Sequence, residues 1–336
     1  MSRAWRLDGV GIESLRLETR ALPEPGAGEV RVRMTAAAIN HRDLGILAGA
    51  YPTKANVIPF SDGAGVIEAV GPGVSQWAAG DAVISSFYPD WEGGPANAAN
   101  HARSLGCETD GVLAEHTILP ASALIRAPQT LDPAAAATLP CAGLTAWSAL
   151  FTEGHLRAGE TVLIQGTGGV AIFALQLARM AGARAIVLTS DAAKAERACS
   201  LGADHIINYR ETPEWAEAVL AATNGEGVDL IIELGGQDTL PKSLNCVKVG
   251  GRICIIGVLS GLVAPVPVPP ILFRHIHLTG ITVGHRSDLA ALVRAVDANG
   301  IVPIVDGSFD FADARDAYRA LPQAKHFGKL VVTMAR

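Results

Sequence analysis

A glycine-rich segment directly after an apolar run constrains the fold of this 336-residue chain most strongly. The apolar run Val162-Leu163-Ile164 is expected to form a buried strand, and the segment Gly166-Thr167-Gly168-Gly169-Val170-Ala171 leads into helical spacing of apolar residues. Gly166 permits a tight turn, Gly168 lets the backbone approach a pyrophosphate, and Ala171 allows close helix packing. The helix that follows presents unpaired N–H groups to an anion. The segment predicts a dinucleotide site in a doubly wound α/β fold; a glycine-rich turn without a cofactor is the alternative.

The strand after this helix bears on the choice of nicotinamide cofactor. NAD-selective sites end this strand with an acidic residue that binds the ribose hydroxyls, but here it ends at Thr189 and Ser190. Lys194 and Arg197 follow on the next helix and suit a 2′-phosphate, although either could lie on a solvated helix face. These residues favour NADP(H). NAD(H) stays open, because a shift of two positions would make Asp191 the ribose acid.

Strand and helix signals divide the chain into two differently patterned parts. From about residue 28 to 120, short strands are separated by turns such as Gly71-Pro72-Gly73 and Gly80-Asp81, which indicates a β-rich barrel. From about residue 161, apolar runs alternate with helical segments, which predicts a parallel sheet covered by helices. In the C-terminal region this alternation of apolar runs and helical segments stops, and a strand-like run follows at 330–332. The C-terminal region could therefore pack back on the first part.

Composition and charge argue against several classes of partner. The net charge is −6 and there is no dense Lys/Arg run, so we expect no nucleic acid partner. The N-terminus has no apolar signal core, and prolines interrupt the most apolar late stretch, 261–273, so we expect neither export nor a membrane span. The five cysteines are widely spaced with no Cys-x-x-Cys pair, which argues against a disulfide framework and favours the cytoplasm.

Motifs spread along almost the whole chain carry a family resemblance. Besides the glycine-rich segment, they are Gly28-Glu29-Val30, Asn40-His41-Arg42-Asp43, Gly63-Ala64-Gly65-Val66, Gly80-Asp81-Ala82-Val83, Leu139-Pro140-Cys141-Ala142-Gly143-Leu144-Thr145-Ala146, Leu201-Gly202-Ala203-Asp204 and Phe327-Gly328-Lys329. With them the chain resembles the medium-chain dehydrogenase/reductase family. The resemblance implies a GroES-like β-barrel catalytic domain, residues 1–140 and 284–336, and a Rossmann domain with a doubly wound parallel sheet that binds NADP(H), residues 141–283.

The residues at the family's metal positions bear on zinc. The alcohol dehydrogenase branch holds a catalytic zinc with two cysteines and a histidine. The first cysteine position matches Asn40 and the histidine position matches Ser61, so Cys141 remains alone. The four-cysteine structural zinc lobe is also missing, since only Cys107 lies between 86 and 111. We therefore expect no metal, and the resemblance points to the zinc-independent branch, similar to quinone oxidoreductases and enone reductases.

The same resemblance assigns the catalytic residues. Asn40 is expected to donate its amide to the substrate oxygen, and Tyr51 to act as a wall or proton source of the cleft. Asp43 is a third candidate, although a buried acid in this turn could simply hold the loop through backbone N–H groups. Arg42 replaces the usual proton-relay hydroxyl, and it could meet a negative substrate, meet a cofactor phosphate or point into solvent.

Further cofactor contacts are implied by the resemblance alone. They surround the nicotinamide, the adenosine ribose and the 2′-phosphate, and one lysine approaches the cofactor from the catalytic domain. A turn that merely needs a positive φ is the ordinary explanation for each glycine among them. Together with Gly166, Gly168, Gly169, Val170, Thr189, Ser190 and Lys194, the predicted contacts are Thr145, Tyr209, Gly235, Gly257, Leu259, Val283 and Lys329.

These expectations describe a reductase that transfers hydride from NADP(H) to a small quinone, enone or other conjugated carbonyl. Two alternatives stay open. The first is an alcohol dehydrogenase or aldehyde reductase of the same family that works without zinc. The second is a nucleotide-binding sensor or scaffold on the same fold. Relatives commonly pair through the edge of the Rossmann sheet, so we expect a homodimer.

Overall fold

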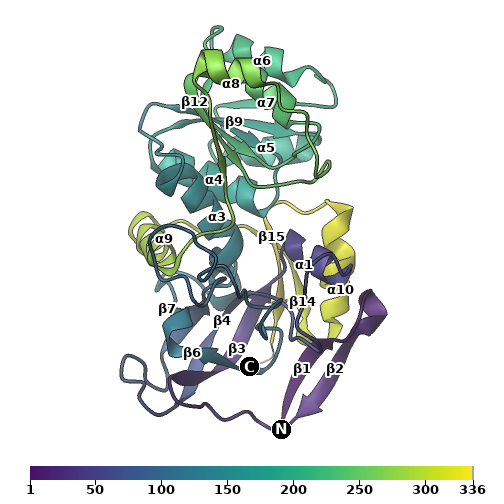
Figure 1. The fold of residues 1–336 in the computed structure, drawn as a ribbon, viewed down its shortest axis with the longest axis vertical. Helices are drawn as coiled ribbons and strands as arrows, with labels where there is room; N and C mark the ends of the chain where they lie inside the picture. Colours follow the sequence, from purple (N-terminus) through teal and green to yellow (C-terminus); the bar gives the residue numbers. More distant parts are fainter. Residues whose placement is uncertain (335–336) are drawn as a thin grey trace. The chain divides into compact units, whose positions relative to one another are not determined.

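The computed structural model describes residues 1–334. It divides into two compact units (Figure 1). Unit 1 consists of Met1–Leu144 together with the chain from Gly284 onward, and unit 2 is Thr145–Val283. The predicted fold class is confirmed, since unit 1 carries a GroES-like β-fold and unit 2 a Rossmann-like parallel sheet.

Unit 2 is built on a six-stranded parallel sheet of order β10-β9-β8-β11-β12-β13. Chain order reverses at β8, which pairs with β9 on one side and β11 on the other, so a crevice is expected at their carboxyl ends. The strands are β8 (Thr161–Gln165), β9 (Arg184–Thr189), β10 (His205–Asn208), β11 (Val228–Glu233), β12 (Val247–Ile255) and β13 (His277–Gly280).

Helices cover the apolar faces of this sheet. Every residue of β8 is buried, as expected for a strand with helices on both sides. The face that α4 buries includes Ile172, Leu175 and Ala178, at the spacing that predicted the helix. The helices are α3 (Leu144–Trp147, which starts at the unit boundary), α4 (Gly169–Met180), α5 (Ala192–Ser200), α6 (Trp215–Ala222), α7 (Leu240–Cys246) and α8 (Val268–Arg274).

Unit 1 is organised around β3, the longest strand of its main sheet. The buried residues of β3 alternate along most of its length, and it pairs antiparallel with β4, β6 and β15. The strands are β1 (Ser2–Leu7), β2 (Leu15–Arg20), β3 (Glu29–Ala38), β4 (Asp62–Val70), β5 (Ala82–Ser85), β6 (His116–Pro120), β7 (Leu124–Arg126), β14 (Val305–Asp310) and β15 (Lys329–Thr333). The helices are α1 (His41–Leu47), α2 (Pro133–Ala136), α9 (Arg286–Asn299) and α10 (Ala314–Ala320).

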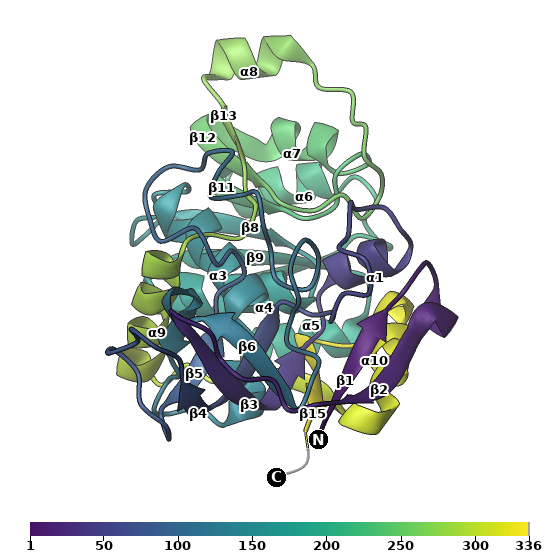
Figure 2. The same cartoon turned by 60° about the horizontal axis from the view of Figure 1, so that its bottom comes forward.

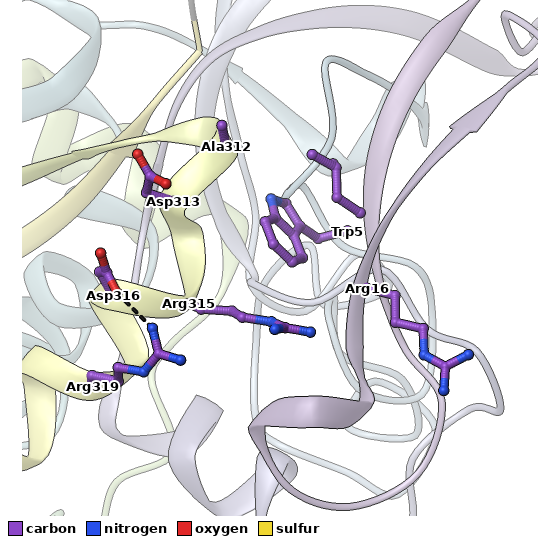
Figure 3. Close-up of a pocket in the computed structure, with 8 residues that line it drawn as sticks. Trp5, Arg16, Ala312, Asp313, Arg315, Asp316 and Arg319 are labelled. Atoms are coloured by element: carbon purple, nitrogen blue, oxygen red, sulfur yellow. Dashed lines mark hydrogen bonds and ion pairs between the residues drawn. The ribbon is translucent and has the colours of Figure 1, made fainter.

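The β1–β2 hairpin lies beside α10, far from it in sequence (Figure 2). The Trp5 indole donates to the Phe311 carbonyl (2.7 Å), and the Arg315 guanidinium donates to the Leu15 carbonyl (2.6 Å). A surface cavity of about 410 Å³ lies between these elements, and its charged side chains include the paired Arg319 and Asp316 (Figure 3). Charged side chains that line this cavity are already engaged, Arg319 with Asp316 and Arg315 with a backbone carbonyl. The contact of Arg315 helps to attach the hairpin to α10.

Within residues 1–334, no helix is both long and apolar enough to cross a membrane.

Candidate active site

The turn between β3 and α1 is held by reciprocal hydrogen bonds. Asn40 has an extended backbone just before α1, and its N–H donates to Asp43 Oδ2 (2.7 Å). The Asp43 N–H in turn donates to the Asn40 carbonyl (3.0 Å). The Asp43 carboxylate is 1% exposed, and its Oδ1 has no hydrogen-bond partner among the described residues. Asp43 therefore positions Asn40 through the backbone.

Strand register brings a lysine from the other end of the chain to Asn40. Val331 of β15 lies opposite Ala38 of β3 in an antiparallel pair, so Lys329 falls beside residue 40. Its Nζ donates to Asn40 Oδ1 (2.6 Å) and to the Ile39 carbonyl (2.5 Å). Because an ammonium can only donate, the Asn40 atom that faces it must be the oxygen. The amide nitrogen is buried and makes no hydrogen bond of ordinary length among the described residues. The Asn40 side chain nevertheless interacts with the Asp62 carboxylate and lowers its pKa.

A buried acid that sequence analysis missed completes this cluster. Asp62 begins β4 opposite Ala38 and is fully buried. It accepts from the Ser61 hydroxyl (2.6 Å) and from the Cys141 backbone N–H (2.9 Å). Burial raises the pKa of Asp62, while the Lys329 charge opposes that rise. The available signal was its place directly after Ser61, since Ser61 was already matched to a ligand position.

Burial also shifts the neighbouring titratable groups. The pKa of Asp43 rises from 3.8 to about 6, chiefly through burial, with Arg42 as the largest opposing influence. Burial and the Asp62 charge raise the pKa of the Cys141 thiol well above its ordinary value. The pKa of the buried Tyr318 rises as well, through burial and the Asp43 charge. Cys141 therefore stays a protonated thiol at neutral pH.

Arg42 faces inward. Its guanidinium lies over the Phe87 ring, 4.1 Å from the ring centre, and donates to the Ser104 hydroxyl (2.7 Å) and the Leu105 carbonyl (2.5 Å). These contacts tie α1 to the segment between 86 and 111, where the family's structural zinc lobe would lie. Ring contacts of Trp91 with His101 and Tyr88 order the same segment. Arg42 thus has a structural role that the sequence alternatives did not include.

Tyr51 lies beyond the end of α1 and is 44% exposed. Its ring packs on Gly45, since a Cβ placed at Gly45 would come 2.7 Å from the ring. Gly45 therefore fixes where this aromatic side chain lies. Its suggested role as a wall or proton source stays a prediction.

The glycine-rich loop of unit 2 leaves space above its backbone. Gly166 has φ +81°, which favours glycine, and its N–H donates to the Leu188 carbonyl (2.8 Å). A Cβ at Gly166 or Gly168 would meet nothing within 4 Å, so the backbone is open to a ligand at both positions. Gly169 and Val170 form the first turn of α4. This cradle at a helix N-terminus fits a dinucleotide pyrophosphate.

The residues at the end of β9 differ in exposure, and their roles toward a cofactor stay predictions. Thr189 is buried and Ser190 is partly exposed. Asp191, the alternative ribose acid, caps α5, because its Oδ1 accepts from the Lys194 N–H (2.9 Å). Tyr209, which follows β10, is 41% exposed.

A buried network centred on Glu233 holds the loop after β11, and sequence analysis missed it. The Glu233 carboxylate accepts from the N–H groups of Gly235 and Gly236 (both 3.0 Å) and from Gln165 Nε2 (2.7 Å). Gln165 Oε1 accepts from the N–H groups of Leu234 (3.0 Å) and Gly235 (3.1 Å). Gln165 directly precedes Gly166, so one network joins the two predicted cofactor loops of unit 2. An acid at the end of a buried strand was the signal.

The remaining predicted contacts lie in the same loop region or at the unit boundary. Gly257 packs so closely on Leu234 that a Cβ would come 2.0 Å from its carbonyl oxygen. Leu259 is 62% exposed. Thr145 is buried, and Val283 has φ +66°, a left-handed backbone that is unusual for a β-branched residue. The structure does not test their roles toward a cofactor.

Two family models match the chain. Residues 26–129 match the alcohol dehydrogenase GroES-like domain, and residues 169–298 match the zinc-binding dehydrogenase model. A zinc-type alcohol dehydrogenase-like protein of Schizosaccharomyces pombe is 41% identical over 96% of each chain. A Sinorhizobium meliloti 1021 protein assigned as an alcohol dehydrogenase has a crystal structure with a TM-score of 0.94 and 43% identity, over 99% of this chain and 98% of that one.

Other similar proteins include reductases. An acryloyl-coenzyme A reductase of Sulfurisphaera tokodaii is 29% identical over 95% of this chain and 96% of its own. A 2-haloacrylate reductase of a Burkholderia species is 34% identical over 73% of this chain and 69% of its own. A mycobacterial protein solved in complex with NADPH has a TM-score of 0.83 and 28% identity, over 99% of this chain and all of that one.

These matches extend over both units, and their fold and motifs agree with those described above. The chain therefore belongs to the medium-chain dehydrogenase/reductase family, as an NAD(P)-binding oxidoreductase of the alcohol dehydrogenase-like type.

Proposed function

We propose that the protein is a zinc-independent, NADP(H)-dependent reductase of small quinones, enones or other conjugated carbonyls. The observation that carries the proposal is the Asn40 amide, whose oxygen is bound by Lys329 while its buried nitrogen, on which Asp62 also acts, makes no hydrogen bond of ordinary length. An unsatisfied buried donor costs about 1–3 kcal/mol. A substrate oxygen that accepts from this nitrogen would recover that cost.

The residues at the family's metal positions fit zinc poorly. An amide and a hydroxyl, Asn40 and Ser61, stand where strong ligands are needed, and zinc prefers thiolate and imidazole. The Lys329 ammonium is bonded to Asn40 and would repel a dication. This chemistry of the donor set supports zinc independence.

A conjugated carbonyl needs less electrophilic help than an isolated one. The bound nicotinamide supplies the hydride. Hydride added to the β-carbon leaves negative charge on the carbonyl oxygen, where the Asn40 N–H can stabilise it. A proton from solvent or from the exposed Tyr51 hydroxyl then completes the reduction at the α-carbon. The two similar proteins named as reductases of acryloyl-coenzyme A and 2-haloacrylate, both conjugated by their names, support this substrate class.

NADP(H) is the proposed cofactor, with NAD(H) as the lesser alternative. Asp191 is engaged as the cap of α5, and Thr189 and Ser190 carry no charge that would repel a 2′-phosphate. Lys194 lies in the first turn of the same helix and supplies positive charge nearby. The similar protein solved with NADPH agrees with this choice.

A turnover screen tests the function. NADPH and NADH are offered with enones, quinones, aldehydes and alcohols, with and without a chelator, and metal content is measured on the same sample. Reduction of enones or quinones that survives chelation is expected. Activity that chelation removes and zinc restores would contradict the proposal. Alcohol oxidation that survives chelation would favour the zinc-free alcohol dehydrogenase, and tight NADPH binding without any turnover would favour the sensor.

A variant of Asn40, the residue on which the proposal rests, adds a direct test to the screen. Asn40→Asp keeps an oxygen for Lys329 but removes the N–H donors, so kcat is expected to fall by about 10²-fold. Asn299→Ala, at the exposed end of α9, is the matched control and should leave kcat unchanged. Equal kcat values in both variants would exclude Asn40 as the carbonyl donor.

We also propose that two copies pair through unit 2. β13 is an edge strand of the sheet, and edge strands invite pairing. Large apolar side chains are exposed in the segment before it, at Val258, Leu259, Leu262, Val263, Val268, Leu272 and Phe273. Sedimentation of the wild type and of Leu272→Glu tests this: the wild type should be a dimer and the variant a monomer, and a monomeric wild type would contradict it.

We further propose a cytoplasmic location. The five cysteines are all unpaired, which supports a reducing compartment.

A further inference from the structure

We propose that Lys329 is a positioning residue for the reaction: its ammonium holds the Asn40 amide so that the amide N–H groups face the substrate oxygen. The inference rests on the proposed function, and it differs from the resemblance, which placed Lys329 against the cofactor. Its basis is a pair of hydrogen bonds made within unit 1 together with a buried amide nitrogen that makes no hydrogen bond of ordinary length.

The position of the ammonium follows from backbone register. Lys329 begins β15, and the pairing of Val331 with Ala38 carries it past the end of β3 to Asn40. The side chain is 5% exposed, and two of its three N–H groups are used on Asn40 Oδ1 and the Ile39 carbonyl. An ammonium this enclosed has little freedom to follow a ligand.

Because of the geometry of a primary amide, this contact fixes the orientation of the Asn40 side chain. The oxygen and nitrogen of a planar amide lie on opposite branches of one carbon, so binding the oxygen fixes the direction of both N–H groups. Without Lys329, the Asn40 side chain could turn over and present its oxygen, which would repel a carbonyl oxygen. Lys329 therefore selects the donor face of Asn40.

Buried acids lie around Lys329 and balance its charge. Asp62 and Asp43 are both buried, and the Lys329 charge acts on each of them. Asp62 accepts from Ser61 and Cys141 and also interacts with the Asn40 side chain, so its charge balances the ammonium beside Asn40. A buried charge needs such a counter-charge. The cluster thus provides a fixed positive charge beside Asn40 from the chain itself.

A double-mutant cycle tests whether Lys329 acts through Asn40. Asn40→Ala, Lys329→Met and the double variant are assayed for kcat and for the KM of NADPH and of an enone. We expect Lys329→Met to lower kcat by about 10-fold or more and to leave the KM for NADPH unchanged. The double variant should be no slower than Asn40→Ala, because residues that act as one unit are not additive. Lys329→Arg should restore part of kcat.

Two other results would overturn the proposal. A raised KM for NADPH with normal kcat in Lys329→Met would make Lys329 a cofactor ligand. Losses in kcat that multiply in the double variant would make it independent of Asn40. Lys54→Met is the matched control, since Lys54 is a surface lysine of unit 1 paired with Asp110, and it should behave as the wild type.

Two additions keep the test decisive. If Lys329→Met does not fold because Asp62 is left without its counter-charge, the variant Lys329→Met with Asp62→Asn removes both charges and enters the cycle instead. The side-chain NH₂ signal of Asn40, identified by its loss in Asn40→Ala, provides a readout that needs no turnover. Slow hydrogen exchange of this signal in the wild type and fast exchange in the lysine variant are expected, and equal exchange would refute the orientation. A wild type that reduces no conjugated carbonyl would refute only the proposed function.

Discussion

The substitution Asp43→Asn tests the buried cluster through the pH dependence of stability. Asp43 is buried, and its pKa rises from 3.8 to about 6, mainly through burial. Arg42, the Asn40 N–H and Lys329 oppose this rise, whereas Asp62 adds to it. Asparagine has nearly the same shape, and its carbonyl oxygen can still accept from the Asn40 N–H. The substitution therefore removes the titration and keeps the main hydrogen bond.

The magnitude follows from the shift. One pKa unit corresponds to about 1.4 kcal/mol, so a rise from 3.8 to about 6 corresponds to about 3 kcal/mol. Because the folded-state pKa is the higher one, the contribution of Asp43 is fully present below about pH 4 and is lost as the pH rises through about 6. The asparagine variant has no such loss. Its stability relative to the wild type should therefore increase by about 3 kcal/mol between about pH 4 and pH 7.5.

Denaturant unfolding of both proteins, followed by a probe in unit 1, measures this difference across the pH range. Curves of unfolding free energy against pH that stay parallel would refute the reasoning. The activity of the variant is informative as well. A kcat within a few-fold of the wild type would assign Asp43 to positioning Asn40, and a loss of about 10³-fold in a folded variant would restore it as a catalytic residue.

Three further predictions concern Lys194, Arg42 and Glu233. Lys194→Ala should weaken NADPH binding by about 10-fold and leave NADH binding nearly unchanged, because a charge-assisted bond to the 2′-phosphate is lost; equal losses in fluorescence titration would contradict the phosphate assignment. Arg42→Leu should speed proteolytic cleavage between 86 and 111, since the Phe87 stacking and two hydrogen bonds disappear, and an unchanged cleavage rate would show that the segment holds without it. Glu233→Gln should raise the Kd of NADPH by about 10-fold, because one carboxylate oxygen becomes an NH₂ group that must face either the Gly235 and Gly236 N–H groups or Gln165 Nε2; an unchanged Kd, measured calorimetrically, would limit Glu233 to a structural role.

Local patterns in the sequence predicted the fold and part of the site. The strand before Gly166 and the helix after it have periodicities that read directly as β8 and α4, since each depends on neighbours in sequence. Asn40 was identified because it stands at a matched position in a motif. The same local argument identified the turn after it as a possible backbone anchor, which is the contact that Asp43 makes.

The contacts that decide the chemistry could not be predicted in the same way. The bond between Lys329 and Asn40 joins residues 289 positions apart and depends on the register of β15 against β3. The inward direction of Arg42 depends on Phe87, which lies on a separate segment. The Glu233 network depends on which strand neighbours β8 in the sheet. No pattern within one segment reports such pairings.

The place of β15 in the sheet has a consequence for how the protein is made. β3 is synthesised before unit 2, yet its partner strand β15 is synthesised after unit 2. Unit 2 is continuous in sequence and can begin to fold while unit 1 still waits for its closing strand. Lys329 arrives with that strand, so a nascent chain gains a held Asn40 amide only after unit 2 has been synthesised. Chains that stop before β15 should therefore retain the nucleotide-binding unit without the Asn40 amide held in place.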